Sequence, residues 1–175
     1  MKKIFVFLAL AVVGFASRSA SAQIPNAKDV VSSTAYTSAD PVAPGKEFQI
    51  AVVLKIRDGY HINARKTTLD YLIPTDLKME LPAGFKAGEV NYPEGTLKSF
   101  TFSKDEKLNV YTGTVILRVK ITPTTGVGVG AQHIPLKLRY QACSESVCLP
   151  PVRQDVEASF TTAADAKPAH AELFK

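Results

Sequence analysis

The chain has 175 residues, of which 46% are hydrophobic and 21% charged, with 21 Lys and Arg against 16 Asp and Glu and two cysteines. This composition excludes a disordered, collagen-like or disulfide-dense chain, and it fits one globular domain that buries a core without needing cross-links. The net charge of +5 would suit binding to nucleic acid or to an anionic surface only if the basic residues belonged to the folded domain.

The first 22 residues have the three parts of a secretion signal. Met1-Lys2-Lys3 is positively charged, residues 4–16 form an apolar run, and Ala20-Ser21-Ala22 has the small-x-small form of a signal-peptidase site. The apolar run is shorter than the roughly 20 residues that a membrane-spanning helix needs. Removing residues 1–22 leaves 18 basic and 16 acidic residues, so the basic excess belongs mainly to the signal. We expect a periplasmic protein with no membrane anchor and no nucleic-acid partner.

Several segments of the remaining chain alternate hydrophobic and polar residues with a period of two, which is the pattern of half-buried strands. The clearest are residues 50–56, 111–121, 134–140 and 152–160, and weaker ones are residues 35–38, 77–81, 89–92 and 97–103. Pro and Gly clusters lie between these segments, and no window of helical length has a convincing 3.6-residue periodicity. We predict an all-β, immunoglobulin-like antiparallel β-sandwich over residues 23–160, followed by a flexible Ala-rich tail at residues 161–175.

Cys143 and Cys148 form the pair with the most obvious reactivity. They follow the strand predicted at residues 134–140 and precede Pro150-Pro151, so that a short turn can bring the two Cα atoms within reach of a disulfide. Closing so small a loop adds only about 2 kcal/mol in the chain-entropy model, so the bridge is a weak staple and suits a bond that is made and broken. The alternative is a structural disulfide at a hairpin of an exported protein.

The other reactive residue types give weaker signals. His61 follows Asp58-Gly59-Tyr60, and a lone histidine at a strand end is more often structural than a base. A copper or zinc site built from Cys143, Cys148 and His61 stays open, but no spacing argues for it, and no His or Met closely follows Cys148 as a blue-copper site would require. The sequence has no phosphate-binding glycine loop, zinc-protease motif or serine-nucleophile elbow. We expect no metal and no cofactor.

Three motifs occur together in one order along the chain. Tyr140-Gln141-Ala142-Cys143 with Cys148-Leu149-Pro150-Pro151 resembles the active-site segment of the N-terminal domain family of the thiol:disulfide interchange protein DsbD. Residues 56–61 look like the Lys-Asp-Gly-Tyr strand end of that family, and Leu81-Pro82-Ala83-Gly84 looks like its Leu-Pro-x-Gly turn. The resemblance extends from about residue 28 to residue 160.

The resemblance implies an immunoglobulin-like domain that relays electrons through its cysteine pair to or from thioredoxin-fold periplasmic proteins, in support of disulfide isomerisation or cytochrome c maturation. It implies that Cys148 forms the mixed disulfide with a partner and that Cys143 resolves it. It also implies a cap loop, matched here by residues 89–95, although this stretch lacks the phenylalanine of the family cap. The residues that it places around the pair or in the cap are Tyr60, His61, Asn63, Asn91, Tyr92 and Tyr140.

Two further expectations concern partners. DsbD continues into a membrane electron carrier and this sequence ends at Lys175, so we expect a separate membrane electron donor for a monomeric domain. The alternative function, from a different class, is a non-catalytic binding module with a static disulfide, which recruits its partner through residues 58–65 and 89–95.

Overall fold

The structure is a computed structural model that describes residues 25–103 and 105–175, so the predicted signal peptide lies outside the described residues. The regular structure of the described part is almost entirely β, with two short 3-10 helices, η1 (Ala27–Asp29) and η2 (Ala171–Leu173). The strands are β1 (Val31–Thr37), β2 (Phe48–Ile56), β3 (His61–Asn63), β4 (Asp76–Met79), β5 (Phe85–Ala87), β6 (Thr96–Lys98), β7 (Leu108–Tyr111), β8 (Thr114–Pro123), β9 (Gly130–Tyr140), β10 (Ala142–Cys143) and β11 (Val152–Thr162).

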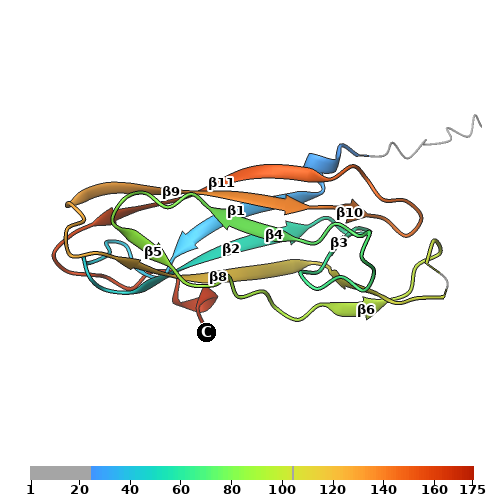
Figure 1. Cartoon of the computed structure of the whole chain (residues 1–175), viewed down its shortest axis with the longest axis horizontal. Helices are drawn as coiled ribbons and strands as arrows, with labels where there is room; N and C mark the ends of the chain where they lie inside the picture. Colours follow the sequence, from blue (N-terminus) through green and yellow to red (C-terminus); the bar gives the residue numbers. More distant parts are fainter. Residues whose placement is uncertain (1–24, 104) are drawn as a thin grey trace, which may run out of the picture.

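The strands form three antiparallel sheets. One has the order β1-β2-β8-β5 and a second has the order β11-β9-β4, and these two are the layers of the sandwich (Figure 1). The third has the order β10-β3-β7-β6, consists of short strands and lies at one end of the molecule. The fold class is therefore confirmed: the protein is an all-β, immunoglobulin-like sandwich of antiparallel sheets.

The strand alternation read from the sequence decides which side chains face the core. In β9 and β11, paired from Val152 opposite Tyr140 to Thr162 opposite Gly130, buried and exposed positions alternate. A register slip by one residue would turn every buried side chain outward, so the pattern fixes the pairing. The side chains of the core that are fully buried include Ile50, Leu54, Leu117, Ile121, Ile134, Leu136, Leu138 and Tyr140.

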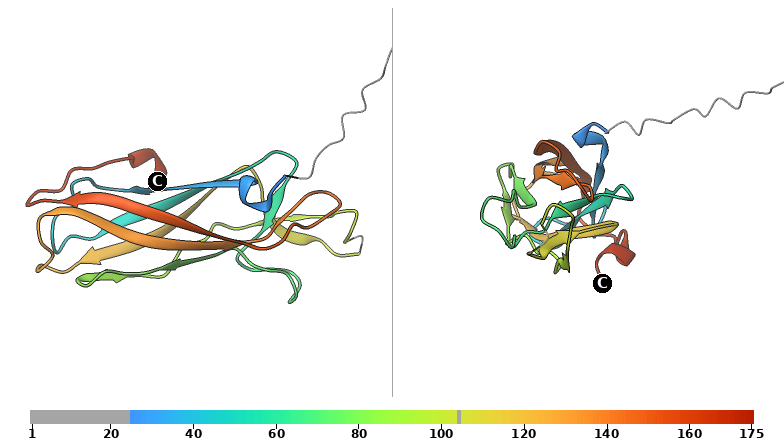
Figure 2. Two further views of the ribbon diagram at one scale, coloured as in Figure 1. Left: turned by 90° about the horizontal axis from the view of Figure 1, so that it is seen from above. Right: turned by 90° about the vertical axis from the view of Figure 1, so that its right-hand side faces the viewer.

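The C-terminal residues are ordered against the sandwich, which corrects the expectation of a flexible tail from residue 161. Strand β11 continues to Thr162, and the next segment runs beside the loop after β1, where Asp40 N donates to the Lys167 carbonyl (2.9 Å) and Ala169 N to the Ser38 carbonyl (3.0 Å). Figure 2 shows the C-terminal turn beside β1. The composition of this segment does not indicate that it packs on the sandwich, because backbone hydrogen bonds hold it in place and not a large hydrophobic stripe.

The C-terminal segment after β11 also explains why β2 is buried on both faces. Tyr36 of β1 packs its ring 4.8 Å from the His170 ring, and Arg118 of β8 donates from Nε to the Leu173 carbonyl (2.7 Å). Tyr36 and Arg118 both pair with Ala51 of β2, so the tail crosses the outer face of the sheet at Ala51, which is 0% exposed. A strand covered on both faces reads as a continuous hydrophobic run.

Three strand predictions differ from the structure. Of residues 97–103, only the first two belong to a strand, β6, and the rest form a loop. The segment 111–121 is divided between β7 and β8 at Thr112-Gly113, where Gly113 has a φ of 65° and the chain passes from one sheet to another. Residues 89–92 form no strand and contribute only an isolated bridge between Asn91 and Arg118. Alternation alone does not distinguish one long strand from two that belong to different sheets.

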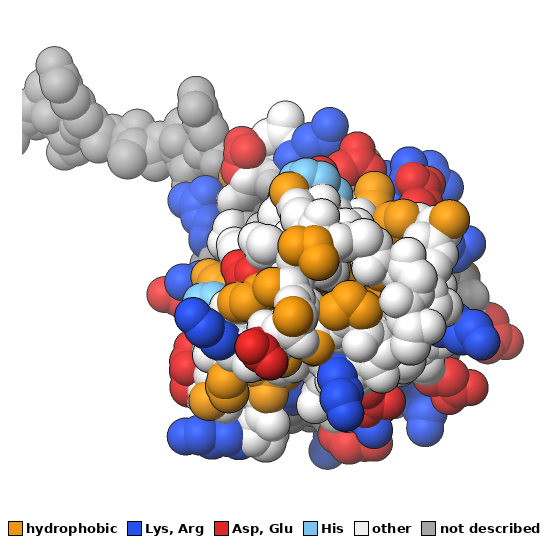
Figure 3. All heavy atoms as spheres, turned by 90° about the vertical axis from the view of Figure 1, so that its left-hand side faces the viewer, with side chains coloured by type: hydrophobic (Ala, Val, Ile, Leu, Met, Phe, Trp, Pro, Cys, Tyr) orange, Lys and Arg blue, Asp and Glu red, His pale blue; other side chains and the backbone are white. Residues whose placement is uncertain are grey.

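The end of the molecule opposite the third sheet has a surface that is partly apolar and partly charged. Figure 3 shows hydrophobic side chains near the middle of this face with charged side chains around them.

Among the described residues, no helix has the length and apolar character that crossing a membrane requires.

Candidate functional site

The two cysteines close a hairpin at the end of the molecule where the third sheet lies. Cys143 and Cys148 are disulfide-bonded, with the sulfurs 2.00 Å apart and the Cα atoms 3.9 Å apart. Leu149 N donates to the Ala142 carbonyl and Ser144 N to the Val147 carbonyl, both at 2.8 Å, so the cysteines form a non-hydrogen-bonded cross-strand pair between these bonds. Such pairs have the shorter of the two Cα separations found in antiparallel ladders.

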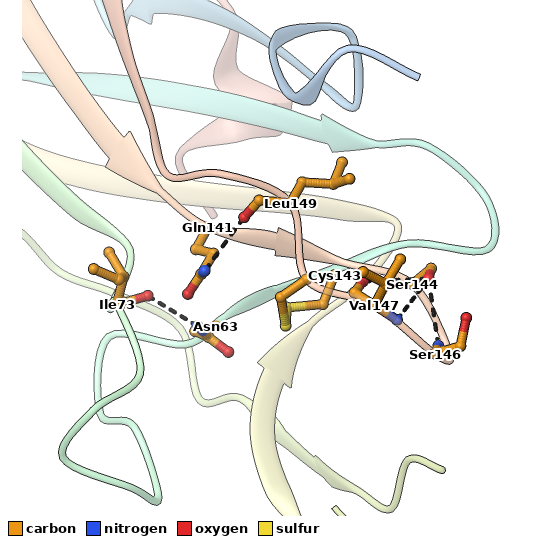
Figure 4. Close-up of a disulfide and its surroundings, with 9 residues drawn as sticks. Asn63, Ile73, Gln141, Cys143, Ser144, Ser146, Val147 and Leu149 are labelled. Atoms are coloured by element: carbon orange, nitrogen blue, oxygen red, sulfur yellow. Dashed lines mark hydrogen bonds between the residues drawn. A yellow bond between two sulfur atoms is a disulfide. The ribbon is translucent and has the colours of Figure 1, made fainter. Parts of the chain in front are cut away.

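Local hydrogen bonds shape the turn between the cysteines. The Ser144 hydroxyl oxygen accepts from Ser146 N (3.3 Å) and Val147 N (3.2 Å), and the Gln141 side chain donates to the Leu149 carbonyl (3.3 Å) (Figure 4). The turn holds itself closed with few contacts to the sandwich. None of these three hydrogen bonds involves a cysteine sulfur.

The two sulfur-bearing residues differ in access. Cys143 is 0% exposed, whereas Cys148 is partly exposed. Cys143 lies in β10 and pairs with β3, and Cys148 lies on the free side of the hairpin. Since thiol-disulfide exchange requires access to the attacked or attacking sulfur, Cys148, as the more exposed residue, is the better placed of the two to meet a second molecule.

His61 lies directly opposite Cys143 in the pairing of β3 with β10. Its side chain is 2% exposed, its Nε2 is buried without a hydrogen-bond partner, and its ring stacks on Phe100 with the centroids 3.9 Å apart. Burial, together with the smaller effect of the nearby positive charge of Lys98, lowers the pKa of His61 to about 4. The imidazole is therefore neutral at neutral pH.

An aromatic segment between β6 and β7 covers the hairpin. Phe100 is buried, Phe102 is 41% exposed and stacks beside it at 5.5 Å, and the Thr101 hydroxyl donates to the Glu145 carbonyl (2.6 Å). We call residues Ser99 to Ser103 the aromatic segment. Phe100 belongs to a small hydrophobic cluster, separate from the main core, whose other members are Leu69, Leu72, Leu108 and Val110.

A cleft of about 450 Å³ opens beside the hairpin. Its walls come from the turn between β2 and β3, from the start of the aromatic segment and from the cysteine turn. They include Arg57, Asp58, Tyr60, His61, Lys98 and Glu145. The cleft therefore has both charged and aromatic walls next to the cysteine pair.

Of the remaining predicted site residues, Tyr60 and Asn63 lie near the cysteine hairpin. Tyr60 lines this cleft and packs against the main core. Asn63 is 0% exposed and donates from its amide to the Ile73 carbonyl (3.0 Å), while its side-chain oxygen has no partner (Figure 4). Asn63 pairs with Val110 and donates its backbone N–H to the Gln141 carbonyl (3.4 Å), so it supports the strand that carries Cys143.

The other three lie in different surroundings. Tyr140 is fully buried in the main core, where burial raises its pKa to about 12 and its hydroxyl donates to the Ala27 carbonyl (3.4 Å). The Tyr92 hydroxyl accepts from Leu77 N (2.8 Å), and its ring lies 5.2 Å below the Arg65 guanidinium. Asn91 exchanges backbone hydrogen bonds with Arg118 of β8. The stretch 89–95 is thus fastened to the sandwich, and the aromatic segment takes the place next to the cysteines.

Sequence reasoning missed the aromatic segment. The available signal was Phe100-Thr101-Phe102, two large aromatic residues one apart in a polar stretch between Lys98 and Lys104. The resemblance implied a cap at residues 89–95, whereas the segment that hydrogen-bonds to the cysteine turn is the one that contains Thr101. Pairing of β6 with β7 identifies the loop between these strands as the one that returns over the hairpin.

No group of three or more His, Cys, Asp or Glu side chains that could hold a metal ion is found in residues 25–103 and 105–175. Both cysteines are engaged in the disulfide. Strand pairing places the imidazole of His61 opposite the disulfide-bonded Cys143.

Comparison with known proteins identifies the family. The family model described as "Thiol:disulfide interchange protein DsbD, N-terminal" matches residues 29–159. No curated protein matches the sequence. Among solved structures, the reduced DsbD N-terminal domain of Neisseria meningitidis is 21% identical, with 83% of this chain and 95% of that chain covered and a TM-score of 0.48.

Two further structures are similar. A complex of the DsbD N-terminal and PilB N-terminal domains from Neisseria meningitidis is 22% identical, with 74% of this chain and 80% of that chain covered and a TM-score of 0.41. The N-terminal periplasmic domain of ScsB from Proteus mirabilis is 9% identical, with 73% of this chain and 45% of that chain covered and a TM-score of 0.47. The family match covers both cysteines and most of the chain, so this protein belongs to the DsbD N-terminal domain family.

Proposed function

We propose that this protein is an exported thiol-disulfide exchange module that relays electrons through Cys143 and Cys148 to thioredoxin-fold partners in the periplasm. The observation that carries the proposal is the unequal access of two bonded cysteines, since Cys143 is 0% exposed and Cys148 is partly exposed. A purely structural cross-link needs no exposed sulfur. An exchange site needs one sulfur that a partner can reach and a second sulfur that only the first can reach.

The exchange steps balance as follows. In the reduced protein the Cys148 thiolate attacks a partner disulfide, forms a mixed disulfide and releases one partner thiolate. Cys143 then attacks the Cys148 sulfur, which forms the intramolecular disulfide and releases the second partner thiolate. The partner gains two electrons and two protons, and the module loses them. A separate membrane electron donor would return the module to the dithiol form, and the reduced partners would serve disulfide isomerisation or cytochrome c maturation.

The surface around the hairpin supports docking of a protein partner. Val147 in the cysteine turn is 42% exposed and Phe102 in the aromatic segment is 41% exposed, and a hydrogen bond from Thr101 to Glu145 joins the two segments. Exposed apolar side chains beside a polar cleft are typical of protein-binding surfaces. The aromatic segment would shield the disulfide until a partner displaces it.

The decisive experiment traps the mixed disulfide. The Cys143→Ser variant, reduced and then mixed with a purified, oxidised thioredoxin-fold protein, should accumulate a covalent complex through Cys148, seen by non-reducing electrophoresis and mass spectrometry. The matched Cys148→Ser variant should accumulate little, because Cys143 is buried. Equal trapping by both variants, or trapping by neither, would contradict the relay.

Equilibration with glutathione separates the relay from a binding module that carries a static disulfide. A relay should titrate between dithiol and disulfide within the range of glutathione buffers. A midpoint well below about −300 mV would mark a bond that resists the glutathione pool and would favour the static alternative.

A further inference from the structure

One row of three side chains crosses the end of the molecule. Cys143 pairs directly with His61 on one side and with Cys148 on the other. Side chains that lie directly opposite one another in an antiparallel ladder point to the same face and have Cβ atoms roughly 5 Å apart. The imidazole and both sulfurs therefore share one face, with Cys143 in the middle.

The imidazole has an unused nitrogen at this place. Nε2 of His61 is buried and makes no hydrogen bond while Cys143 is bonded to Cys148. Buried polar atoms without a partner are uncommon and carry a cost, so each one requires an explanation. Stacking on Phe100 explains the orientation of the His61 ring. It does not explain why this position carries a ring nitrogen, since a phenylalanine at position 61 would stack equally well.

Reduction of the disulfide supplies a partner. When Cys148 is engaged with another molecule, Cys143 is a thiol that is no longer tied to it and can turn among its staggered rotamers on the face that it shares with His61. Both Cys143 and His61 are buried, and burial favours the neutral form of the imidazole. A neutral imidazole nitrogen is an acceptor for a thiol proton.

We propose that His61 is the base of the resolving step, taking the proton from Cys143 as this thiol attacks the mixed disulfide at Cys148. This inference rests on the proposed relay and goes beyond it by assigning a residue to proton transfer. As the Cys143–Cys148 bond forms, the bond from Cys148 to the partner sulfur breaks. The proton passes from the Cys143 sulfur to Nε2 and then to the departing partner thiolate, so the ring ends the step neutral.

The surrounding charges favour a transient rather than a stable imidazolium. Lys98 on β6 opposes positive charge on His61, and Arg57 in the turn before β3 adds a second cation to the cleft wall. Asp58 and Glu145 contribute negative charge to the same cleft, and Tyr60 adds a neutral hydroxyl. His61 therefore returns its proton readily after each resolving step.

The experiment uses glutathione disulfide as the probe, so it does not depend on a protein partner. The reduced protein is mixed with glutathione disulfide, quenched with acid and analysed by mass spectrometry, which resolves the dithiol, the glutathione adduct on Cys148 and the intramolecular disulfide. We expect His61→Phe to slow conversion of the adduct to the disulfide by about tenfold, less than the hundredfold or more typical of general bases, because the pKa of His61 lies well below neutral pH. Formation of the adduct at Cys148 should stay within about twofold of the wild type.

Two other variants define the cause. His61→Gln keeps a hydrogen-bonding group of similar reach but cannot accept a proton, and we expect it to be as slow as His61→Phe in the resolving step. His133→Phe removes a histidine on the exposed side of β9 and should match the wild type. A His61→Gln variant as fast as the wild type, or an unchanged resolving step in His61→Phe, would overturn the proposal.

A measurement on the unaltered protein keeps the test independent of variant folding. Nitrogen resonances of the His61 ring, recorded by NMR in the disulfide and dithiol forms, should show that Nε2 acquires a hydrogen bond on reduction while the His133 ring is unchanged. An Nε2 resonance that is identical in both forms would overturn the proposal. Failure of the relay itself would appear elsewhere, as absence of a trapped thioredoxin-fold complex.

Discussion

The sandwich body and the end of the molecule that carries the cysteines are stabilised differently. The body has a large continuous core, and the cysteine end has a small one. The body joins β9 and β11, each 11 residues long, over a core that includes Leu117 and Leu136, both 0% exposed. At the cysteine end β10 has 2 residues and β3 has 3, and the aromatic segment is held by the small cluster around Phe100.

This difference separates stability from reactivity. Long strands and a continuous core open only with the whole molecule, whereas short strands and few apolar contacts open locally at a lower free-energy cost. The disulfide is attached to the rigid body through β10, and its cover belongs to the weaker region. The site can therefore change its access without loss of the fold, and substitutions in the two regions should have different consequences.

The largest effect is expected from a cavity in the sandwich body. Leu117→Ala removes a fully buried side chain of β8 and should lower the free energy of unfolding by about 2–5 kcal/mol. Denaturant unfolding followed by circular dichroism measures this change. The reaction of the folded variant with glutathione disulfide should remain within about twofold of the wild type, and a large change in that rate would contradict the separation of the two regions.

Acidification should weaken the cysteine end through His61. Its pKa is lowered from 6.5 to about 4 in the folded protein, mainly by burial, so between these pH values the unfolded chain binds a proton that the folded chain does not. The free energy of unfolding should therefore fall as pH decreases from 6.5 to 4, by up to about 3 kcal/mol. Unfolding curves across this range should show the slope in the wild type and a smaller one in His61→Phe.

Loss of the aromatic cover should affect access more than stability. Phe100→Ala removes the ring that stacks on His61, and we expect dithiothreitol to reduce the disulfide about tenfold faster, which corresponds to about 1.4 kcal/mol of local opening. Stopped-flow thiol trapping measures the rate. Phe102→Ala is the matched control, because Phe102 is 41% exposed and lies 6.5 Å from His61, and its rate should rise less.

The smallest expected effect concerns the hydrogen bond that joins the cover to the hairpin. Thr101→Val keeps the shape of the side chain and removes the bond to the Glu145 carbonyl, a loss of about 1 kcal/mol at most. Hydrogen exchange at the amides of residues 144–147 should become faster, with no change in β9. Thr114→Val, at an exposed strand position, is the control and should leave exchange at the hairpin unaltered.

The sequence was most informative where a strand is long and one face is buried. The alternation in residues 134–140 and 152–160 predicted β9 and β11 and the side chains that enter the core, because burial of one face imposes a period of two. The disulfide was indicated by two cysteines separated by a short turn in an exported chain. The family resemblance was confirmed by the match over residues 29–159.

Three features depended on contacts between residues far apart in the chain. The C-terminal segment is ordered by backbone bonds to the loop after β1, Gly113 divides one predicted strand between two sheets, and Phe100 covers the site from a loop that follows β6. None of these contacts has a local pattern, since each is decided by which surface remains available once the strands have paired.

The amino-acid sequence by itself determined that the chain forms a β-sandwich with a cysteine pair on a short turn, because hydrophobic periodicity and cysteine spacing are local properties. Only the tertiary structure decided that Cys143 is buried and Cys148 accessible, and that His61 lies opposite Cys143 with an unpartnered nitrogen. Burial and cross-strand neighbours arise when β10 pairs with β3 under the aromatic segment, and this pairing joins parts of the chain about 80 residues apart.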